Sequence, residues 1–468
     1  MDIIHIASEV FPFSKTGGLA DVAYALPKAQ SKAGSKVKIL TPYYSSIPKD
    51  FKITPTGFKT LTNTKKGNFE YEIYKSNISD VEIYFFSNDY LFNRNGLYTE
   101  NGLDYPDNYL RFGSFCMACL NFIDQFEYYS DIIHVHDWQT SFTPVLLKTA
   151  YGFISSKVVL TIHNMAFQGI FDHSIVDVLN LPTYLYNIEM LEFYGFVNIL
   201  KGGIVFSDYF TTVSPAYAEE IKREQYGCAL EGVVRKYEHR LKGVLNGIDY
   251  DIWNPVTDKH LYKKYNIKNL NNKNLNKIAF CENNNLDSNK PLFIFVSRFT
   301  EQKGADLIIE VLEQFSFENA TFAIIGDGNP KIAERFKKLA KVRKNIFLYV
   351  GFNENLAHIL YAAADFLLMP SRFEPCGLSQ LIAMRYGTIP IVTRTGGLKD
   401  TVKDIDKKGY GLCIDLPSIN ILYNVIERGV NLYGDNMLRS NIIVKCMNQD
   451  FSWAKSAEEY LNIYEGVT

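Results

Sequence analysis

The sequence predicts an α/β protein with two doubly wound parallel sheets, one in each half of the chain. A chain of 468 residues is too long to fold around a single hydrophobic core of ordinary size. Apolar residues make up 47% of the chain and charged residues 21%, so large cores are possible and long disorder is not expected. In both halves, short β-rich runs alternate with helical patterns, which is typical of parallel sheets with helices on their faces.

The first half begins with an apolar strand pattern and continues with a helix and a second strand. We expect a strand over 2–10, a helix over 19–34 and a strand over 35–44. Further β-rich runs lie at 131–139, 157–164, 208–214 and 241–249. Cys116 and Cys119 lie in the apolar helical stretch FGSFCMACLNF, where we expect both thiols to be part of the core.

The second half repeats this alternation more regularly. Strands are expected over 291–299, 320–328, 345–352, 365–373 and 388–396, with helices over 305–315, 330–340, 355–364 and 377–387. Between the halves, residues 265–290 are rich in Asn and Lys and have no sustained apolar period. We therefore expect a surface excursion there, near the domain junction.

Composition excludes several classes of protein. A formal net charge of -2 removes the usual electrostatic argument for a nucleic-acid binder. Seven scattered cysteines argue against a disulfide framework or a zinc site. No apolar segment approaches the length of a membrane span, and the N-terminus has neither a basic leader nor transit-peptide composition. We expect a reduced, soluble, cytoplasmic protein with a neutral or small anionic ligand.

Ligands of open α/β sheets bind outside the carboxyl ends of the strands, so residues just after strands are the informative ones. In the second half these include Arg298 and Lys303, Glu374 with Gly377, and the pair Gly396–Gly397. Two cations beside a helix start suit a phosphate, and glycines let the backbone approach it. The alternatives are that Arg298 and Lys303 are solvated surface cations and that Glu374 caps a helix start. The glycine pair could equally belong to an ordinary tight turn.

The first half supplies a matching set. The stretch SKTGGLADV offers Lys15 and the backbone of Gly17 and Gly18 to an anion. Asp137 and Trp138 follow one strand, and His163 and Asn164 follow the next. Aromatic rings beside polar groups suit a sugar ring, which has apolar faces and hydroxyl edges. Core packing is the alternative for Trp138, and a satisfied strand-end histidine is the alternative for His163.

Taken together, seven motifs resemble those of the bacterial glycogen synthases and the plant starch synthases. The motifs are KTGGLADV, HVHDWQT, TIHN, VLNGID, SRFTEQKG, PSRFEPCGLSQL and RTGGLKDTV, in the family's order along essentially the whole chain. The resemblance implies a GT-B fold, in which two Rossmann-like domains face each other across a deep cleft. It implies an N-terminal acceptor-side domain over 1–245, a C-terminal donor domain over 246–450, and a last helix within 451–468 that crosses back to the first domain.

The resemblance also implies an activity. The family transfers glucose from ADP-glucose to the non-reducing end of an α-1,4-glucan with retention of configuration. Glu374 matches the acidic residue that grips the donor glucose, and the His163 carbonyl would face the anomeric carbon. The implied donor-binding residues are Lys15, Gly17, Gly18, Arg298, Lys303, Phe352, Cys376, Gly377, Leu378, Thr395, Gly396 and Gly397, with Phe352 where the family often has a tyrosine against adenine. The implied sugar and acceptor residues are Asp21, Asp137, Trp138, Asn164, Asn246 and Glu374.

We expect no metal and no cofactor, because cationic side chains can neutralise a diphosphate leaving group. The tripeptides DYD (249–251) and DID (404–406) resemble the metal-binding Asp-x-Asp pairs of other glycosyltransferases but recur by chance. Retention by double displacement would need a carboxylate on the opposite face of the sugar. Because the family's motif supplies a histidine carbonyl there, same-face, ion-pair-like substitution is the favoured hypothesis.

Several rival interpretations stay open at this level. UDP-glucose could replace ADP-glucose, and another retaining transferase, such as a sucrose synthase or a trehalose-forming enzyme, would share the fold. KTGGL and EPCGLSQL favour the glucan synthases. A dehydrogenase would need G-x-G-x-x-G after its first strand, and KTGGLAD lacks that spacing. A catalytically silent sugar-nucleotide or glucan-binding protein could have lost Lys15 or Glu374, and both are present.

Overall fold

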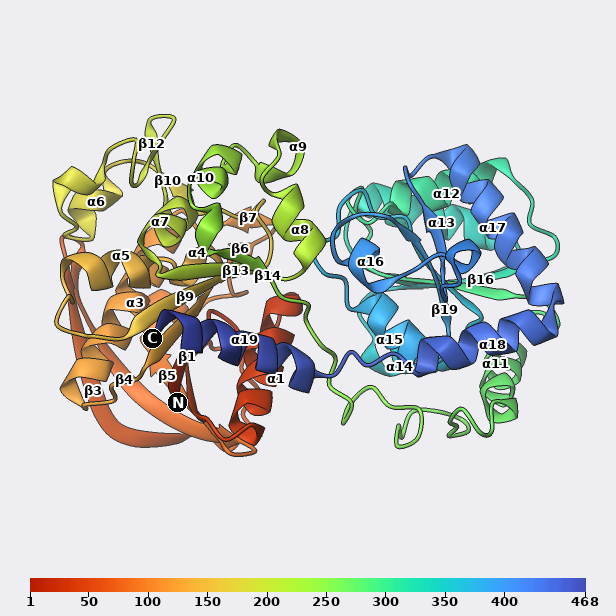
Figure 1. Ribbon diagram of the computed structural model, residues 1–468, viewed down its shortest axis with the longest axis horizontal. Coiled ribbons are helices and arrows are strands. Elements are labelled where there is room, and N and C mark those ends of the chain that lie inside the picture. Colours follow the sequence, from red (N-terminus) through yellow and green to blue (C-terminus); the bar gives the residue numbers. More distant parts are fainter. The chain divides into compact units, whose positions relative to one another are not determined.

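The computed structural model describes all 468 residues, and they divide into two compact units (Figure 1). Unit 1 comprises Met1–Asn246 together with Trp453–Thr468, and unit 2 comprises Gly247–Ser452. Each unit contains one large sheet that is wholly or mainly parallel. The predicted class, two doubly wound α/β sheets, is therefore confirmed.

The unit 1 sheet has nine strands in the order β14-β13-β9-β8-β1-β2-β5-β4-β3. From β14 to β5 all neighbours are parallel, whereas β4 and β3 extend the sheet antiparallel. The strand order reverses beside β1, between β1 and β8. The strands are β1 Asp2–Ile6, β2 Lys36–Pro42, β3 Thr54–Thr64, β4 Gly67–Ile78, β5 Val81–Ser87, β8 Ile132–His136, β9 Lys157–Ile162, β13 Tyr209–Thr212 and β14 Leu241–Gly243.

Helices and small hairpins surround this sheet. The last helix of the chain, α19, packs along α1, although more than 400 positions separate them (Figure 1). The helices are α1 Gly18–Lys32, α2 Asp89–Phe92, α3 Asn108–Gln125, α4 Asp137–Thr140, α5 Phe142–Thr149, α6 Ile175–Val178, α7 Ile199–Phe206, α8 Pro215–Glu220, α9 Glu224–Gly227, α10 Glu231–Lys236 and α19 Trp453–Val467. The short elements are β6 Thr99–Glu100, β7 Leu103–Asp104, β10 Ile170–Phe171, η1 Thr183–Leu185, β11 Glu192–Phe193, β12 Phe196–Asn198 and η2 Glu238–Arg240.

One face of the unit 1 sheet carries a row of polar side chains among apolar strands. His5 pairs in register with His134, and Thr161 pairs in register with both His136 and Thr211. These residues are completely buried, and their partners include Gln30 of α1 and Tyr464 of α19. We call His5, His134, His136, Thr161 and Thr211 the polar stripe.

The unit 2 sheet is parallel throughout, in the order β17-β16-β15-β18-β19-β20. Numbered by occurrence this order is 3-2-1-4-5-6, the doubly wound arrangement whose ligands bind where the order reverses. The strands are β15 Leu292–Val296, β16 Thr321–Gly326, β17 Ile346–Val350, β18 Phe366–Met369, β19 Ile389–Thr393 and β20 Leu412–Ile414. The helices are α11 Asn271–Asn283, α12 Ala305–Gln314, α13 Pro330–Val342, α14 Glu354–Ala363, α15 Ser379–Arg385, α16 Gly396–Thr401, η3 Ile405–Lys407, α17 Ile419–Gly434 and α18 Asn436–Met447.

Local sequence explains where several of these helices start. Asn329 accepts a hydrogen bond from the backbone of Lys331, and Pro330 occupies the first turn of α13. Asn353 caps α14 and Ser418 caps α17 in the same way. Such side chains satisfy donors that the first helical turn leaves free, so each strand-to-helix boundary is fixed within a residue or two.

The predicted surface excursion over 265–290 is wrong in part, because it contains α11. This helix buries the polar side chains of Lys273, Asn276 and Lys277 beside the apolar Phe280 and Cys281. Lys277 forms an ion pair of 2.7 Å with Asp365, and Lys273 donates to the carbonyl of Ala362 and to the hydroxyl of Thr388. The last carbonyls of α14 thereby gain a hydrogen-bond donor, which stabilises a helix end.

Other expectations about the core are confirmed. Cys116 and Cys119 are fully buried in α3, and all seven cysteines are free thiols. The long hairpin formed by β3 and β4 was not expected. None of the helices combines the length and the apolar character that crossing a bilayer requires.

Candidate functional site

The predicted residues of unit 2 follow four of its strands at the carboxyl edge of the sheet. Arg298 and Lys303 follow β15, and Glu374 follows β18. Gly396 follows β19, and Phe352 follows β17. Because β15 and β18 are adjacent and parallel at the point where the strand order reverses, their loops meet at one edge.

Lys303 and Glu374 are brought together although 71 positions separate them. The ammonium of Lys303 lies 2.6 Å from Glu374 Oε2, and the Ser371 hydroxyl donates to the same oxygen at 3.2 Å. Glu374 is 4% exposed. A carboxylate this buried needs a paired cation and hydrogen bonds to remain charged, and both are present. The loops after β15 and β18 therefore carry one buried ionic pair.

The glycine pair after β19 packs against the loop that carries Glu374. Gly396 has φ +44, and a Cβ there would overlap the carbonyl oxygen of Glu374. A Cβ on Gly397 would overlap the carbonyl of Cys376, while the Gly397 N–H donates to the Glu374 carbonyl at 3.1 Å. Protein packing is thus sufficient reason for these two glycines, separate from any phosphate.

The remaining unit 2 residues differ in exposure. Arg298 is exposed and makes no ion pair within the protein, so its charge is available to a ligand. Phe352 is 79% exposed. Cys376 and Thr395 are buried, and Leu378 is half-buried.

Sequence reasoning missed Gln380, which is fully buried in α15. Its amide nitrogen donates to the carbonyls of Cys376 and Gly377 at 3.0 and 2.9 Å and to the Thr401 hydroxyl at 3.2 Å. Gln380 therefore ties the EPCG loop to α16. A polar residue within the apolar pattern GLSQLIAM was the signal that could have found it.

In unit 1, Lys15 and the first turn of α1 form an open edge after β1. Lys15 pairs with Asp21 at 2.8 Å, and its side chain is 35% exposed. Gly17 has an extended backbone, and a Cβ there would have nothing within 4 Å. Neither backbone conformation nor packing therefore requires glycine at this position. The N-cap residue Gly17 has no side chain to cap α1, and Glu9 accepts a hydrogen bond from the backbone of Ala20. The N–H groups of Gly18 and Leu19 are therefore the ones suited to an anion.

Asp137 and His163 lie at the ends of the adjacent strands β8 and β9 and contact each other. The buried Asp137 carboxylate accepts the backbone N–H of His163 at 2.7 Å, although Asp137 itself adopts a left-handed φ of +55. Burial raises the pKa of Asp137 to about 7, while hydrogen bonds from the backbone N–H groups of His163 and Asn164 oppose that shift. Asp137 thus holds the His163 backbone in place.

Trp138 lies in the core of unit 1, as the alternative interpretation of this residue expects. It is 8% exposed, and its ring packs against Phe112 and Phe171 at centroid distances of 5.5 Å. A Cβ on Gly169 would overlap the indole, so the turn at Gly169 closes directly onto the ring. The ring faces are therefore covered by protein.

The other predicted sugar neighbours are partly engaged. Asn164 accepts the backbone N–H of Ala166 at 3.0 Å. Asn246 is buried, and its side-chain oxygen has no hydrogen-bond partner within the protein. A buried, unpaired acceptor is costly unless a ligand or water satisfies it.

Sequence reasoning also missed a buried carboxyl next to the Lys15 loop. Glu9 accepts both the backbone N–H and the hydroxyl of Thr16, at 2.6 and 2.8 Å. Burial raises the pKa of Glu9 to about 7, against the opposing effect of these hydrogen bonds. Glu9 therefore positions the turn that presents Lys15.

The histidines at the edge and in the polar stripe are linked to one another. His163 Nε2 lies 3.1 Å from His136 Nδ1, and His136 Nε2 lies 3.1 Å from His5 Nδ1. Burial lowers the pKa of His5 to about 4, and it also lowers the pKa values of His134, His136 and His163. These rings are consequently neutral at pH 7.

His5, His134 and His136 are also close enough together to be tested as metal ligands, since their ligand atoms lie within 4.8 Å of one another. Each of their ring nitrogens already has a hydrogen-bond partner: His5 contacts His136 and Gln30, His136 contacts His5 and His163, and His134 contacts Tyr464 and Thr161. A cation would have to break several of these bonds. The group therefore fits a hydrogen-bond network better than a metal centre.

The carboxylates of the two Asp-x-Asp tripeptides interact with other groups of the protein. Arg428 forms ion pairs with Asp404 and Asp406 at 2.8 and 2.7 Å, and Asp404 also accepts the backbone N–H of Cys413. Asp249 accepts the backbone N–H of Asp251 at 2.8 Å. The DID carboxylates thus have an arginine as their counter-charge.

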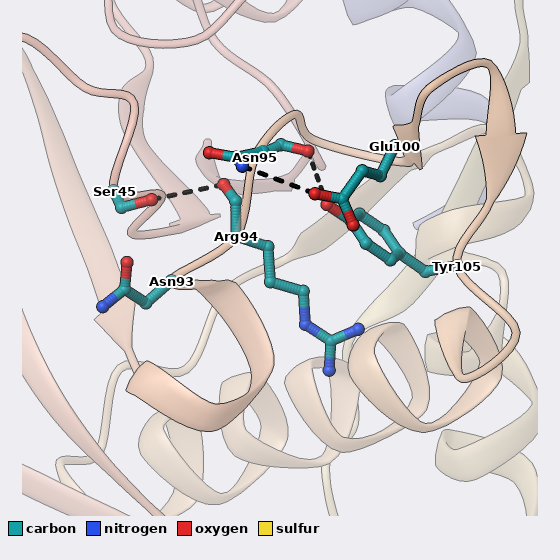
Figure 2. Close-up of a pocket in the computed structure, with 6 residues that line it drawn as sticks. All are labelled: Ser45, Asn93, Arg94, Asn95, Glu100 and Tyr105. Atoms are coloured by element: carbon teal, nitrogen blue, oxygen red, sulfur yellow. Dashed lines mark hydrogen bonds between the residues drawn. The ribbon is translucent and has the colours of Figure 1, made fainter.

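Unit 1 also contains a polar hollow of about 450 Å³ (Figure 2). It is lined by Ser45, Asn93, Arg94, Asn95, Glu100 and Tyr105. The Arg94 guanidinium is paired with Asp107 through two hydrogen bonds of 2.7 and 2.6 Å, so its charge is balanced. None of the predicted site residues lines this hollow.

Two family models match the chain. The starch synthase catalytic domain matches residues 2–236, and the glycosyl transferases group 1 model matches residues 276–431. The two matches fall on unit 1 and unit 2 respectively.

Relatives match over the whole length. The glycogen synthase of Aquifex aeolicus is 42% identical over 100% of this chain and 99% of its own length. The glycogen synthase of Alkaliphilus metalliredigens is 40% identical over 100% of both chains. Among solved structures, the catalytic domain of starch synthase IV from Arabidopsis thaliana, bound to ADP and acarbose, has a TM-score of 0.93 at 32% identity and covers 99% of each chain.

Proposed function

The chain belongs to the glycogen synthase and starch synthase family and is a GT-B glycosyltransferase of glycogen synthesis; from this premise we propose its donor, its acceptor and the residues that act. The donor is ADP-glucose, and the glucosyl group is added with retention to the non-reducing end of an α-1,4-glucan. In support, the Arabidopsis starch synthase IV structure holds ADP and acarbose.

The observation that carries the proposal is the buried Lys303–Glu374 pair at the carboxyl edge of the unit 2 sheet. The lysine neutralises the carboxylate in the absence of donor. When a diphosphate approaches Lys303, one Glu374 oxygen becomes free to accept a hydroxyl of the donor glucose. Such a preorganised pair serves both the sugar and the leaving group without large rearrangement.

Charge develops on the diphosphate as the glycosidic bond breaks, so cations and N–H groups directed at it lower the barrier. Arg298 has no protein partner for its guanidinium, and Lys15 forms an exposed pair with Asp21 and lies 5.3 Å from the centroid of the Phe11 ring. We assign both to the phosphates, together with the N–H groups of Gly17 and Gly18 at the start of α1. Phe352 presents a free ring face on which adenine can stack.

At the sugar, Asp137 holds the backbone of His163, whose carbonyl lies beside the anomeric carbon in this proposal. The unpaired oxygen of Asn246 accepts a sugar hydroxyl. Because the Asp137 carboxylate is engaged by the backbone N–H groups of His163 and Asn164, it is not free to attack the sugar. Retention then follows from same-face departure and attack. A glucosyl adduct trapped on any carboxylate would overturn this step.

No metal is required in this scheme, because Lys15, Arg298 and Lys303 supply the positive charge. We expect full activity after exhaustive chelation with EDTA, and a loss restored by Mg²⁺ or Mn²⁺ would contradict this point. The seven free thiols suit a reducing, cytoplasmic setting.

The test of the proposal is incubation with a short maltooligosaccharide and either ADP-glucose or UDP-glucose, followed by product sizing. We expect products lengthened by single glucose units from ADP-glucose, at a rate well above that from UDP-glucose. Faster transfer from UDP-glucose would reassign the donor. Hydrolysis without elongation would remove the glucan as acceptor.

A further inference from the structure

A continuous hydrogen-bonded chain joins His163 to the C-terminal helix through the core of unit 1. From His163 Nε2 it runs to His136 Nδ1, and from His136 Nε2 to His5 Nδ1, at 3.1 Å each. His5 Nε2 lies 2.8 Å from Gln30 Oε1, and Gln30 Nε2 donates to the Tyr464 hydroxyl at 3.0 Å. Apart from the partly exposed His163, every member is buried.

The chain has a direction, and Gln30 sets it. An amide oxygen can only accept, so His5 Nε2 must carry the proton that it shares with Gln30. A neutral imidazole has one donor and one acceptor, so His5 Nδ1 accepts and His136 Nε2 donates. By the same reasoning His136 Nδ1 accepts from His163 Nε2–H. His163 Nδ1 is then left as an unprotonated acceptor, and it has no partner within the protein.

This reasoning requires each ring to be neutral, and burial makes it so. The pKa of His5 is lowered to about 4, and burial also lowers the pKa values of His136 and His163. A charged ring would donate at both nitrogens and interrupt the sequence of bonds. At neutral pH the tautomer of one ring therefore determines that of the next.

The other end of the Gln30 amide is held by α19. Tyr464 receives a hydrogen bond from Gln30 Nε2, and its hydroxyl contacts His134 Nδ1 at 2.6 Å. His134 Nε2 in turn contacts Thr161 Oγ1 at 2.6 Å. A rotated Gln30 amide would place an N–H against the proton on His5, so the amide can turn only if the histidines change tautomer together. Tyr464 opposes that rotation as long as its hydroxyl donates its proton to His134 Nδ1 and can only accept from Gln30.

We propose that Gln30 and Tyr464 are positioning residues for glucosyl transfer, which hold His163 in the Nε2–H tautomer through His5 and His136. This inference rests on the proposed function in that it assigns His163 to the sugar site. His163 is thereby fixed at two points, its backbone N–H by Asp137 and its ring by His136. Its free Nδ1 can accept a hydrogen bond from a hydroxyl of a bound sugar, whereas the opposite tautomer would present an N–H donor at that position.

The first measurement is the tautomer itself, observed in the full chain labelled with ¹⁵N-histidine. Long-range ¹H–¹⁵N spectra distinguish Nε2–H from Nδ1–H rings, and a His163→Gln variant assigns the signal. We expect the Nε2–H form for His163. An Nδ1–H signal in the wild-type chain would overturn the inference, whatever the outcome of the activity assay.

The second measurement compares variants. Gln30→Met removes both ends of the amide, and Tyr464→Phe removes only the hydroxyl that orients it. We expect mixed His163 tautomers in both and a fall in kcat on the order of tenfold, with the KM for donor nearly unchanged. Gln30→Met removes the acceptor for His5 and is expected to have the larger effect.

Tyr460→Phe is the matched control, because Tyr460 lies one turn earlier on α19. Its hydroxyl contacts Thr161 and Thr211, at 3.3 and 3.5 Å, and it is not a member of the chain that runs from His163 to Tyr464. We expect a similar small loss in melting temperature but an unchanged His163 signal and kcat. Equal losses of kcat in Tyr460→Phe and Tyr464→Phe, with His163 still Nε2–H, would reduce the role of α19 to packing and overturn the inference. If the wild-type protein shows no glucosyl transfer, the proposed function fails. The tautomer measurements would still test whether the hydrogen bonds from Gln30 to His163 set the tautomer of His163.

Discussion

The carboxyl edge of the unit 2 sheet and the polar stripe of unit 1 both bury polar groups, but with different chemistry. In unit 2 the groups are charged and paired, with Lys303 at 2.6 Å from Glu374. In unit 1 they are neutral rings in series, since burial lowers the pKa values of His5, His134 and His136. Each charge in a buried ion pair is stabilised by the opposite charge of its partner. A buried neutral imidazole needs only one hydrogen-bond donor and one acceptor as partners.

The same contrast holds for the glycines. In unit 2, Gly396 is required by its φ of +44 and by contact with the Glu374 carbonyl. In unit 1, Gly17 is extended and surrounded by open space. The loops of unit 2 are therefore already packed around Glu374, while the Lys15 edge of unit 1 leaves room for a ligand.

The largest expected effect is that of Glu374→Gln, which removes the charge from the assembled edge. We expect kcat to fall by roughly 10²- to 10³-fold, because an interaction made at the reacting sugar is lost. ADP binding, measured by calorimetry, should persist. Glu301→Gln, on the exposed loop after β15, is the matched control and should retain activity. An active Glu374→Gln enzyme would remove this residue from the mechanism.

A pair of alanine variants tests the contrast between the two glycines. Gly396→Ala should destabilise unit 2 by about 1–3 kcal/mol, because the Cβ meets backbone and the φ is strained. Gly17→Ala should leave the melting temperature unchanged but raise the KM for ADP-glucose. Thermal unfolding and steady-state kinetics check both. A destabilised Gly17→Ala protein would show that packing, and not a ligand, needs this glycine.

Lys15→Ala tests the open edge by removing one cation. We expect kcat/KM for ADP-glucose to fall on the order of tenfold, with melting temperature nearly unchanged, because an exposed ion pair contributes roughly 0–1 kcal/mol. Lys32→Ala, in the last turn of the same helix, should leave both quantities unchanged. If the Lys15 variant instead unfolds at much lower temperature, the lysine is structural.

The smallest expected effect is a difference between the units in acid. His5, His134, His136 and His163 have pKa values lowered in the fold, so below about pH 6.5 the unfolded chain binds protons that the folded unit 1 does not. Glu9 and Asp137, with pKa values raised to about 7, act in the opposite direction, but two carboxyls are outnumbered by four rings. Unit 1 should therefore lose stability between pH 6.5 and 5, on the order of 1 kcal/mol.

Unit 2 should behave differently over that range. Burial opposes the shift, but hydrogen bonds, from His358 to Asp258 and from Arg428 to Asp404, lower the pKa values of the two carboxyls. Their contribution to stability is therefore lost only as pH falls below about 3.8. Hydrogen exchange of β8 and β16 amides at pH 6.5 and 5, corrected for intrinsic rates, compares the units directly. Equal protection losses in both strands would contradict the expectation.

The sequence predicted the parallel strands well, because buried runs between turn residues leave few alternatives. It did not predict α11, since Lys273 and Lys277 are buried through hydrogen bonds and an ion pair to distant residues that no local period reveals. The β3–β4 hairpin was also missed, although NFEYEIY alternates between buried and exposed side chains.

For the site, the sequence predicted residue types and strand ends but not contacts. Lys303 and Glu374 were both expected at the carboxyl edge, whereas their pairing depends on β15 and β18 being neighbours. The core contacts of Trp138 were not predicted, because the turn that covers it, at Gly169, lies 31 positions later. The polar stripe was missed because its partners come from α1 and α19, at opposite ends of the chain.

The placement of α19 has a consequence for biosynthesis. Unit 2 is one continuous segment, whereas unit 1 needs Trp453–Thr468, which leave the ribosome after all of unit 2. The domain that begins first is thus completed last. Until those residues emerge, Gln30 and His134 lack the Tyr464 hydroxyl that joins them, and the hydrogen-bonded network of unit 1 is incomplete.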